Sequence, residues 1–317
     1  MNALIIGGAG FVGKYLIKHL SETYSWHLSA TKLPGEQLSF PGIDVYDLNL
    51  LDKSDIIMLL KKTQPDYIFH LAAQSSVALS WARPDLTVDI NIKGSLYLLD
   101  ALRECHLSSR VLMIGSGEEY GYIEPDETPV NESTLLRPGN IYAATKACQN
   151  MISGIYAKAY NLPIIMVRAF NHIGPEQSPT FVVSDFCKQV AEIELTKKPP
   201  VLQVGNLSAK RDFSDVRDVV RAYGMLIQKG SAGETYNVGS GHAIAIEELL
   251  NFILKMSKIK IEVQVSKQKL RPVDIPIIEA DVTKLQGCIS WQPRITIQQT
   301  ISETLDYWRS YYKKEGM

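Results

Sequence analysis

Three glycines near the start of the chain, Gly7, Gly10 and Gly13, separate a short apolar run from a helical pattern. The run Ala3–Ile6 has the composition of a buried strand, and Phe11–Leu20 places its apolar side chains on one helical face. Glycine permits a tight turn between the two and the close approach of another backbone or a ligand. A strand, a glycine turn and a helix in this order predict the first unit of an α/β fold.

The same alternation continues through the first half of the chain. Further strands are expected at Tyr67–Ala73, Arg110–Gly115 and Ile164–Arg168, and helices at Ile90–Leu102 and Tyr142–Tyr160. Because the strands are apolar on successive residues, both faces of their sheet should be covered, which is typical of parallel sheets. We therefore predict a Rossmann-type, doubly wound parallel sheet of the α/β class.

Beyond residue 168 the expected elements become shorter, and loops rich in Pro, Gly and Asn appear. We expect a Rossmann domain over residues 1–168 with a returning segment near 212–238. A smaller C-terminal α/β lobe, which would face the substrate, is expected from residues 169–211 and 239–317.

Composition narrows the class of protein. The formal net charge is −1 and the pI is near 6.6, without the basic field of a nucleic-acid-binding protein. No apolar run approaches the ~20 residues that span a bilayer, and the first residues lack the basic segment of a signal peptide. The four cysteines form no CxxC pair. We expect a soluble cytoplasmic protein with no nucleic-acid partner, no membrane attachment and no metal.

The glycine turn also predicts a ligand. At a strand–helix turn the backbone can approach a pyrophosphate, and the helix N-terminus supplies amide donors. The GxxGxxG spacing is a weak signal alone, because a turn without a ligand has the same sequence, but its place at the first turn favours a dinucleotide. The second expected strand ends in Thr31 and Lys32, where a carboxylate commonly holds the ribose of NAD. A hydroxyl and a cation suit a 2′-phosphate better, so we favour NADP(H) over NAD(H), with a solvated surface role for Lys32 as the alternative.

Tyr142 and Lys146 stand four residues apart at the start of a helical pattern. They should lie on one helical face, so that phenol and ammonium can share a site. A nearby ammonium lowers the pKa of a tyrosine, as general acid–base chemistry on a sugar alcohol or ketone requires. Ser116 follows a predicted strand, whose C-terminal end faces the ligand crevice of such a sheet. An incidental helical pair and a turn serine are the alternatives, which the glycine turn in the same chain disfavours.

These motifs resemble the extended short-chain dehydrogenase/reductase superfamily over nearly the whole chain. Within it, the chain is most similar to the GDP-6-deoxy-4-keto-mannose reductases, which make GDP-rhamnose. The matching phrases are Gly7–Gly13, His70–Ala73, Ser116–Gly121, Tyr142 with Lys146, Arg168–Pro175, Arg211–Phe213 and Leu270–Asp274.

The resemblance implies a role for each matching residue of the cofactor side. Ser116, Tyr142 and Lys146 would form the catalytic trio, and Lys146 would also hydrogen-bond the nicotinamide ribose. Asn49–Leu50 stands where an Asp–hydrophobic pair usually contacts the adenine. The expected cofactor contacts are Gly7, Gly10, Phe11, Val12, Gly13, Thr31, Lys32, Asn49, Leu50, Leu71, Ala72 and Ala73.

The resemblance also implies contacts to a nucleotide-linked sugar. Asn171 would help to position its diphosphate, and Arg211 and Arg271 would bind the nucleotide end, since guanidinium groups suit phosphate oxygens. Asp274 would accept hydrogen bonds from ribose hydroxyls. Without the resemblance, Arg211 fits a structural ion pair with Asp212, and Arg271 fits a surface residue.

Glu118 bears on the direction of the reaction. Sugar-nucleotide 4,6-dehydratases of the superfamily carry a glutamate two residues after the catalytic hydroxyl, where it removes the C5 proton. We expect Glu118 to contact substrate hydroxyls first, with proton abstraction as the alternative.

The resemblance therefore implies a reductase of the C4 ketone of a nucleotide-linked 4-keto-6-deoxy sugar. GDP-4-keto-6-deoxy-D-mannose, reduced to GDP-D-rhamnose, is the favoured substrate, and a dTDP-linked hexose is the alternative. A 4,6-dehydratase or 4-epimerase with tightly held NAD(P)+ and a non-catalytic NADP-sensing protein are the rival functions. The resemblance further implies a homodimer through helices near Ile92–Arg103 and Ala143–Tyr160, residues that fit an intramolecular core equally.

Overall fold

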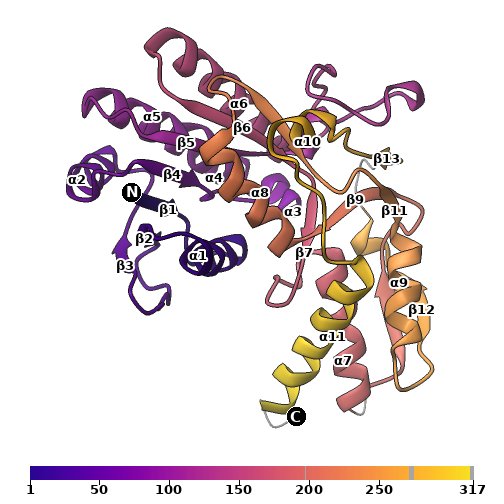
Figure 1. Ribbon diagram of the computed structural model, residues 1–317. Helices are drawn as coiled ribbons and strands as arrows, with labels where there is room; N and C mark the ends of the chain where they lie inside the picture. The colour runs from indigo at the N-terminus through magenta and orange to yellow at the C-terminus, as the bar shows by residue number, and fades with distance from the viewer. Residues whose placement is uncertain (197, 271–274, 315–317) are drawn as a thin grey trace.

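The computed structural model describes residues 1–196, 198–270 and 275–314. Its main sheet has seven strands in the order β10-β6-β5-β4-β1-β2-β3, all parallel (Figure 1). The strand order reverses between β1 and β4, which confirms the predicted doubly wound sheet. Its strands are β1 (Asn2–Ile6), β2 (His27–Lys32), β3 (Asp44–Asp47), β4 (Tyr67–His70), β5 (Arg110–Ser116), β6 (Ile164–Ala169) and β10 (Thr235–Val238).

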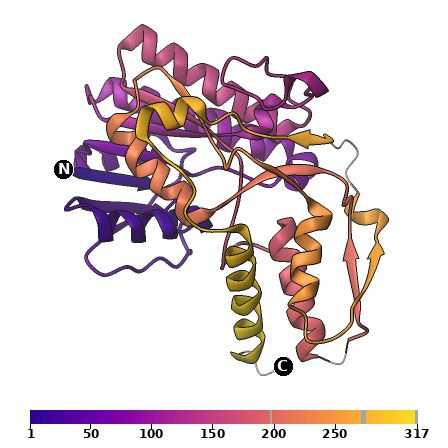
Figure 2. The ribbon, with the colours of Figure 1, turned by 45° about the vertical axis from the view of Figure 1, so that its right-hand side comes forward.

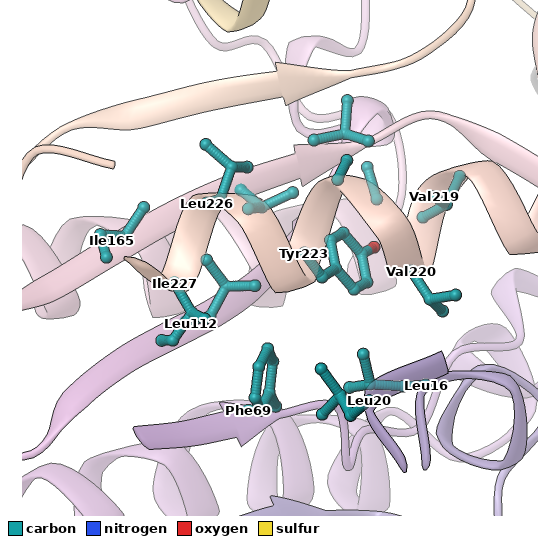
Figure 3. Packing of buried hydrophobic residues seen from close by; sticks show 14 of the residues in the cluster. Leu16, Leu20, Phe69, Leu112, Ile165, Val219, Val220, Tyr223, Leu226 and Ile227 are labelled. Carbon is teal, nitrogen blue, oxygen red and sulfur yellow. The ribbon is translucent and has the colours of Figure 1, made fainter. Parts of the chain in front are cut away.

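Helices cover both faces of this sheet, because its strands are apolar on both sides. In β1, Ala3 and Ile5 pack towards one face while Leu4 and Ile6 pack towards the other. Figure 3 shows the first of these cores, where Tyr223 lies between its helix and the sheet. That face carries α1 (Phe11–Thr23) and α8 (Val216–Lys229), and the opposite face carries α2 (Lys53–Thr63), α5 (Ser95–Glu104) and α6 (Ile141–Tyr160).

Two expected elements differ from the structure. The strand expected through Ala73 ends at His70, since Leu71 and Ala72 both donate their backbone N–H to the carbonyl of Ile6, over 3.0 and 2.9 Å. The helix expected from residue 90 begins as a π-helical turn, η1 (Asp89–Gly94), before α5. Two short helices, α3 (Val77–Ala82) and α4 (Pro84–Val88), precede that turn.

A second lobe is built around three helices that pack on one another, α7 (Val182–Leu195), α9 (Ile246–Lys255) and α11 (Ile297–Lys314) (Figure 2). In it β9 pairs with β7, β11 and β13, and β8 pairs with β12. The bounds of these strands are β7 (Asn171–Ile173), β8 (Val201–Val204), β9 (Lys210–Asp215), β11 (Ala243–Ala245), β12 (Glu262–Val265) and β13 (Ile277–Ile278).

The chain returns to the main sheet twice after β6. The first return is α8 and β10, and the second is α10 (Thr283–Ile289), which packs against both. This second return lies inside the range 239–317 that was expected to belong wholly to the other lobe. Three short 3₁₀ helices complete the described elements: η2 (Gly117–Tyr120), η3 (Pro125–Glu127) and η4 (Lys267–Lys269).

Among the described residues, none of the helices is both long and apolar enough to cross a membrane. The same residues contain no cluster of His, Cys, Asp or Glu side chains placed to hold a metal ion.

Candidate active site

Several of the residues singled out from the sequence gather at one edge of the main sheet. Because the strands are parallel, their C-terminal ends share this edge, where doubly wound sheets bind ligands. Gly7 directly follows β1, Lys32 ends β2, Leu71 follows β4 and Ser116 ends β5. Gly7 has φ +94°, and a Cβ there would lie 2.8 Å from the amide nitrogen of Ala72. The loops after β1 and β4 therefore meet at the point where the strand order reverses.

The glycine turn leaves the start of α1 open to a ligand. A Cβ on Gly13 would lie 2.4 Å from the carbonyl oxygen of Gly7, so this glycine lets the helix pack on its own turn. Gly10 is the N-cap residue and has no side chain with which to cap the helix, and the first turn carries no acidic residue. The N-terminal amides of α1 thus suit an anion such as a pyrophosphate. Phe11 and Val12 pack their half-buried side chains against the core.

At the ends of β2 and β3 the expected polar groups already have partners. Thr31 is buried, and its hydroxyl accepts a hydrogen bond from the backbone N–H of Gly7 over 3.1 Å. Thr31 therefore supports the glycine turn. Lys32 pairs with Asp47, its neighbour on β3, with 2.5 Å between Nζ and Oδ1. The exposed Asn49 accepts from the N–H of Leu51.

Ser116 and Tyr142 lie together at the end of β5, close enough for the Ser116 side chain to lower the pKa of Tyr142. Tyr142 is 9% exposed. Burial raises the pKa of Tyr142, the nearby Ser116 side chain opposes the rise, and the carboxylates of Glu118 and Glu119 add to it. The expected lowering by Lys146 was wrong, because burial disfavours the phenolate and Lys146 directs its ammonium elsewhere. At neutral pH Tyr142 is a protonated phenol, which is the form that can donate a proton.

Lys146 is buried one turn further along α6. Its ammonium donates to the carbonyl of Ile114 over 2.7 Å and to the side-chain oxygen of Gln149 over 3.0 Å. Burial lowers the pKa of Lys146 to about 8, while the charge of Glu119 opposes this. The amine is thus held by neutral acceptors beside the end of β5.

Two asparagines that the sequence analysis did not select hold the start of α6. Asn140 is its N-cap: Oδ1 accepts from the N–H of Ala143 over 2.8 Å, and Nδ2 donates to Glu118 over 3.3 Å. An asparagine immediately before a helical pattern is a sequence signal for an N-cap and could have identified it. This cap connects the helix that carries Tyr142 to the segment that follows Ser116.

Asn91, in the π-helical turn, is fully buried. Its amide exchanges hydrogen bonds with the backbone of Gln74 and donates to the hydroxyl of Thr145 over 3.0 Å. Thr145 in turn donates to the carbonyl of Tyr142. Asn91 therefore joins the loop after β4 to the first turn of α6. A π turn often marks a functional place, but the sequence pattern predicted an ordinary helix here.

The expected substrate contacts are only partly brought together. Glu118 is half-buried beside Ser116, and Asn171 is half-buried on β7, which follows β6 directly. Arg211 is 6% exposed, and its NH1 donates to the carbonyl of Ile275 over 2.6 Å. Arg211 thus ties β9 to the segment before β13. Arg271 and Asp274 lie outside the described residues.

The sheet, the glycine turn at its switch point and the Ser–Tyr–Lys group at the same edge define a dinucleotide-binding enzyme fold of the extended short-chain dehydrogenase/reductase type. The family model for GDP-mannose 4,6 dehydratase matches residues 4–304. The chain belongs to this family.

Three known proteins illustrate the range of similar chains. GDP-6-deoxy-D-mannose reductase of Pseudomonas aeruginosa is 31% identical over 98% of both chains. The structure of RMD from Pseudomonas aeruginosa complexed with NADPH has a TM-score of 0.87 at 30% identity, over 98% of this chain and 100% of that one. UDP-glucose 4-epimerase of Thermotoga maritima, solved with UDP-glucose, has a TM-score of 0.88 at 25% identity over 98% and 100%.

Proposed function

We propose that this protein reduces the C4 ketone of a nucleotide-linked 4-keto-6-deoxy sugar, with GDP-4-keto-6-deoxy-D-mannose as substrate and GDP-D-rhamnose as product. The observation that carries the proposal is the buried Tyr142, whose raised pKa keeps the phenol protonated, beside the buried Ser116 at the ligand edge of the sheet. The similarity to GDP-6-deoxy-D-mannose reductase supports this choice of ketone and nucleotide. A dTDP-linked 4-keto-6-deoxy sugar is the alternative substrate.

The cofactor is NADP(H), with NAD(H) as the second choice. The N-terminal amides of α1 fit its pyrophosphate, and the similar structure of RMD from Pseudomonas aeruginosa is complexed with NADPH. Lys32 is the cation proposed for the 2′-phosphate, and Asp47 balances its charge. A 2′-phosphate would compete with Asp47 for this ammonium.

When bound, NADPH supplies the hydride that C4 receives. The phenol of Tyr142 donates its proton to the C4 oxygen, which takes up the charge as the carbonyl is reduced. Ser116 donates a hydrogen bond to the same oxygen. Lys146 holds the ribose side of the cofactor, and solvent returns a proton to Tyr142 after the alcohol leaves. One ketone, one NADPH and one proton give one alcohol and one NADP+.

In this proposal one lobe binds the cofactor and the other binds the substrate. Residues 1–168, with the segment near 212–238, hold the cofactor, and residues 169–211 and 239–317, apart from α10, form the substrate lobe. The proposed contacts to the nucleotide sugar are Glu118 from the cofactor domain and Asn171, Arg211, Arg271 and Asp274 from the substrate lobe. The diphosphate lies near Asn171, because β7 begins next to the C-terminal end of β6.

A 4,6-dehydratase or 4-epimerase is the second candidate. Glu118 favours it, since it follows Ser116 by two residues and its carboxylate is held by Asn140. The matching family model carries the dehydratase description. This candidate predicts oxidised cofactor bound to the purified protein and turnover without added NADPH.

The active form is a homodimer in the cytoplasm. On α6, Met151 and Ile155 expose 59% and 62% of their surface, and these apolar side chains suit a second copy of the chain. The free cysteines of the described residues fit a reducing compartment.

The direct test incubates the protein with NADPH and either GDP- or dTDP-4-keto-6-deoxy sugar, and follows the absorbance of the reduced nicotinamide. Consumption of NADPH that stops when the ketone is exhausted is the expected result. No consumption with either sugar would refute the reductase, and product formed without NADPH would favour the second candidate.

A further inference from the structure

A buried ion pair lies directly behind Ser116. Glu119 is completely buried and Arg168 is 7% exposed, with 3.1 Å between Glu119 Oε2 and Arg168 Nε. Neither side chain takes part in the proton and hydride transfers described above. A buried ion pair costs desolvation energy, and an apolar pair of the same size often gives equal or greater stability. Its place beside the catalytic serine therefore calls for a reason other than stability.

Glu119 receives three hydrogen bonds. Oε1 accepts from the backbone N–H of Ser116 over 2.8 Å, and Oε2 accepts from Asn150 over 2.9 Å as well as from Arg168. Burial raises the pKa of Glu119, whereas Arg168 and these hydrogen bonds oppose the rise. All three partners are donors, so a protonated carboxyl would point its proton at an N–H group. The ionised carboxylate is the form that fits.

These bonds fix the position of Ser116 on both sides. Glu119 accepts a hydrogen bond from the backbone N–H of Ser116. The hydroxyl of Ser116 accepts one from the N–H of Glu118 over 3.2 Å at the start of η2. A Cβ on Gly115 would lie 2.2 Å from Glu119 Oε1, so only glycine admits the carboxylate at this place. Glu119 therefore packs against Gly115 and hydrogen-bonds Ser116 at the C-terminal end of β5.

The same carboxylate also fixes α6. Asn150 lies on α6 four residues after Lys146 and eight after Tyr142, about one and two turns away. On the far side, Arg168 donates to the hydroxyl of Tyr120 and to the carbonyl of Glu132, each over 3.0 Å. Glu119 thus joins β5, β6 and α6, which carry or support each member of the catalytic trio.

We propose that Glu119 is a positioning residue for the reduction: its carboxylate holds Ser116 against Tyr142 and places a fixed negative charge behind Tyr142 and Lys146. This inference rests on the proposed function, because it assigns a role within the same reaction.

The charge of Glu119 acts on the pKa values of two members of the trio. The carboxylate of Glu119 raises the pKa of both Tyr142 and Lys146. Removing this carboxylate should lower the pKa of Tyr142, so that the phenol loses its proton at a lower pH. On the alkaline side of the pH profile, the rate of ketone reduction should therefore begin to fall at a lower pH. The other titratable groups around the trio are Glu118 from η2, His70 from β4 and Tyr223 from α8, and those around Glu119 are Arg168 from β6 and Tyr120 from η2.

Two variants separate position from charge. Glu119→Asp keeps the charge but shortens the side chain by one methylene, so it cannot reach both Ser116 and Arg168. Glu119→Gln with Arg168→Met removes the charge without leaving the guanidinium unpaired. In this double variant the amide of Asn150 can rotate, because its Oδ1 is buried without a hydrogen-bond partner among the described residues. The matched control is Glu194→Gln with Arg309→Met, which removes a partly buried pair joining α7 and α11.

Steady-state reduction is measured over a range of pH, with NADPH affinity and thermal unfolding as separate readouts. For Glu119→Asp we expect kcat to fall about 10- to 100-fold with little change in NADPH affinity. The pH at which its rate falls should stay as in the wild type. For the double variant we expect a similar loss and an acid shift of the alkaline limb by about half a pH unit or more. The control pair should lose stability and keep the wild-type pH profile.

The inference is overturned if the double variant, folded by its unfolding curve, keeps wild-type kcat and the wild-type alkaline limb. It is equally overturned if the control pair shows the same acid shift. Should the double variant not fold, Glu119→Asp decides the positioning role alone through its kcat at unchanged NADPH affinity. A wild type without turnover on any 4-keto sugar refutes the proposed function instead, so the two failures are distinguishable.

Discussion

Lys146 and Arg168 are both buried cations near the C-terminal ends of β5 and β6, but their surroundings differ. Lys146 donates to a carbonyl and an amide oxygen, and burial lowers its pKa to about 8. Arg168 bonds the carboxylate of Glu119. Burial opposes the charge of Arg168, but Tyr120 and Glu119 raise its pKa overall. A buried cation with neutral acceptors has a pKa closer to neutral pH, whereas one beside a buried carboxylate stays charged over the working range of pH.

In the proposed reaction, Tyr142 and Lys146 form a reactive side of the site, and Glu119 and Arg168 form a supporting side. On the reactive side, Tyr142 and Lys146 have shifted pKa values, which is common where side chains move protons. On the supporting side, Glu119 and Arg168 form an ion pair and hold backbone positions. Substitutions on the two sides should differ in their effects on turnover and stability, and the largest effect is expected at Tyr142.

Tyr142→Phe removes the proposed proton donor and should lower kcat by about 10³-fold or more, with NADPH affinity preserved. The matched control is Tyr223→Phe, because the hydroxyl of Tyr223 is buried without a partner among the described residues. This control should keep full turnover. Stopped-flow or steady-state reduction of a 4-keto sugar gives the rates. Near-normal turnover of Tyr142→Phe would show that the reactive side lies elsewhere.

Arg168→Met leaves the carboxylate of Glu119 buried without its counter-ion. Breaking such a pair should lower the free energy of unfolding by about 3–5 kcal/mol, measured by chemical denaturation. Adding Glu119→Gln should recover a large part of this loss, since no buried charge then remains. If Arg168→Met alone unfolds at the wild-type denaturant concentration, the supporting role of the pair is refuted.

Lys146→Met should abolish turnover yet leave the protein without cofactor as stable at pH 7 as the wild type, or more so. The pKa of Lys146 falls from 10.5 when unfolded to about 8 when folded. The unfolded chain therefore binds more protons between these values, and wild-type stability should rise relative to the variant as pH increases through this window. The total change is on the order of 2–3 kcal/mol. Denaturation curves at pH 7.5 and 10 measure it, and an unchanged difference would contradict the lowered pKa.

Asp47→Asn should have the smallest effect. It releases Lys32, a partly exposed cation at the edge of the site, from its ion pair. Because an exposed pair contributes about 0.2–1 kcal/mol, NADPH should bind roughly two- to fivefold more tightly. NADH, which lacks the 2′-phosphate, should bind as before, and titration of the cofactor fluorescence compares the two. An equal gain for both cofactors would exclude Lys32 as the 2′-phosphate contact.

Much of the fold was predictable because its signals are local. β1, β5 and β6 and the helices α1 and α6 were expected within a few residues of their bounds, since apolar periodicity and glycine punctuation report directly on them. The end of β4 was missed because it depends on Ile6, about 65 residues earlier in the sequence, which accepts hydrogen bonds from the loop after β4.

The sequence by itself determined which residues gather at the ligand edge. Parallel strands bring Gly7, Ser116 and the Tyr142–Lys146 helix to one side whatever the details of packing. The tertiary structure decided their chemistry. It turned Thr31 towards the glycine turn, raised the pKa of Tyr142, and placed Glu119 behind Ser116. Burial and hydrogen bonds between distant segments set these properties, and neither is encoded in the spacing of a motif.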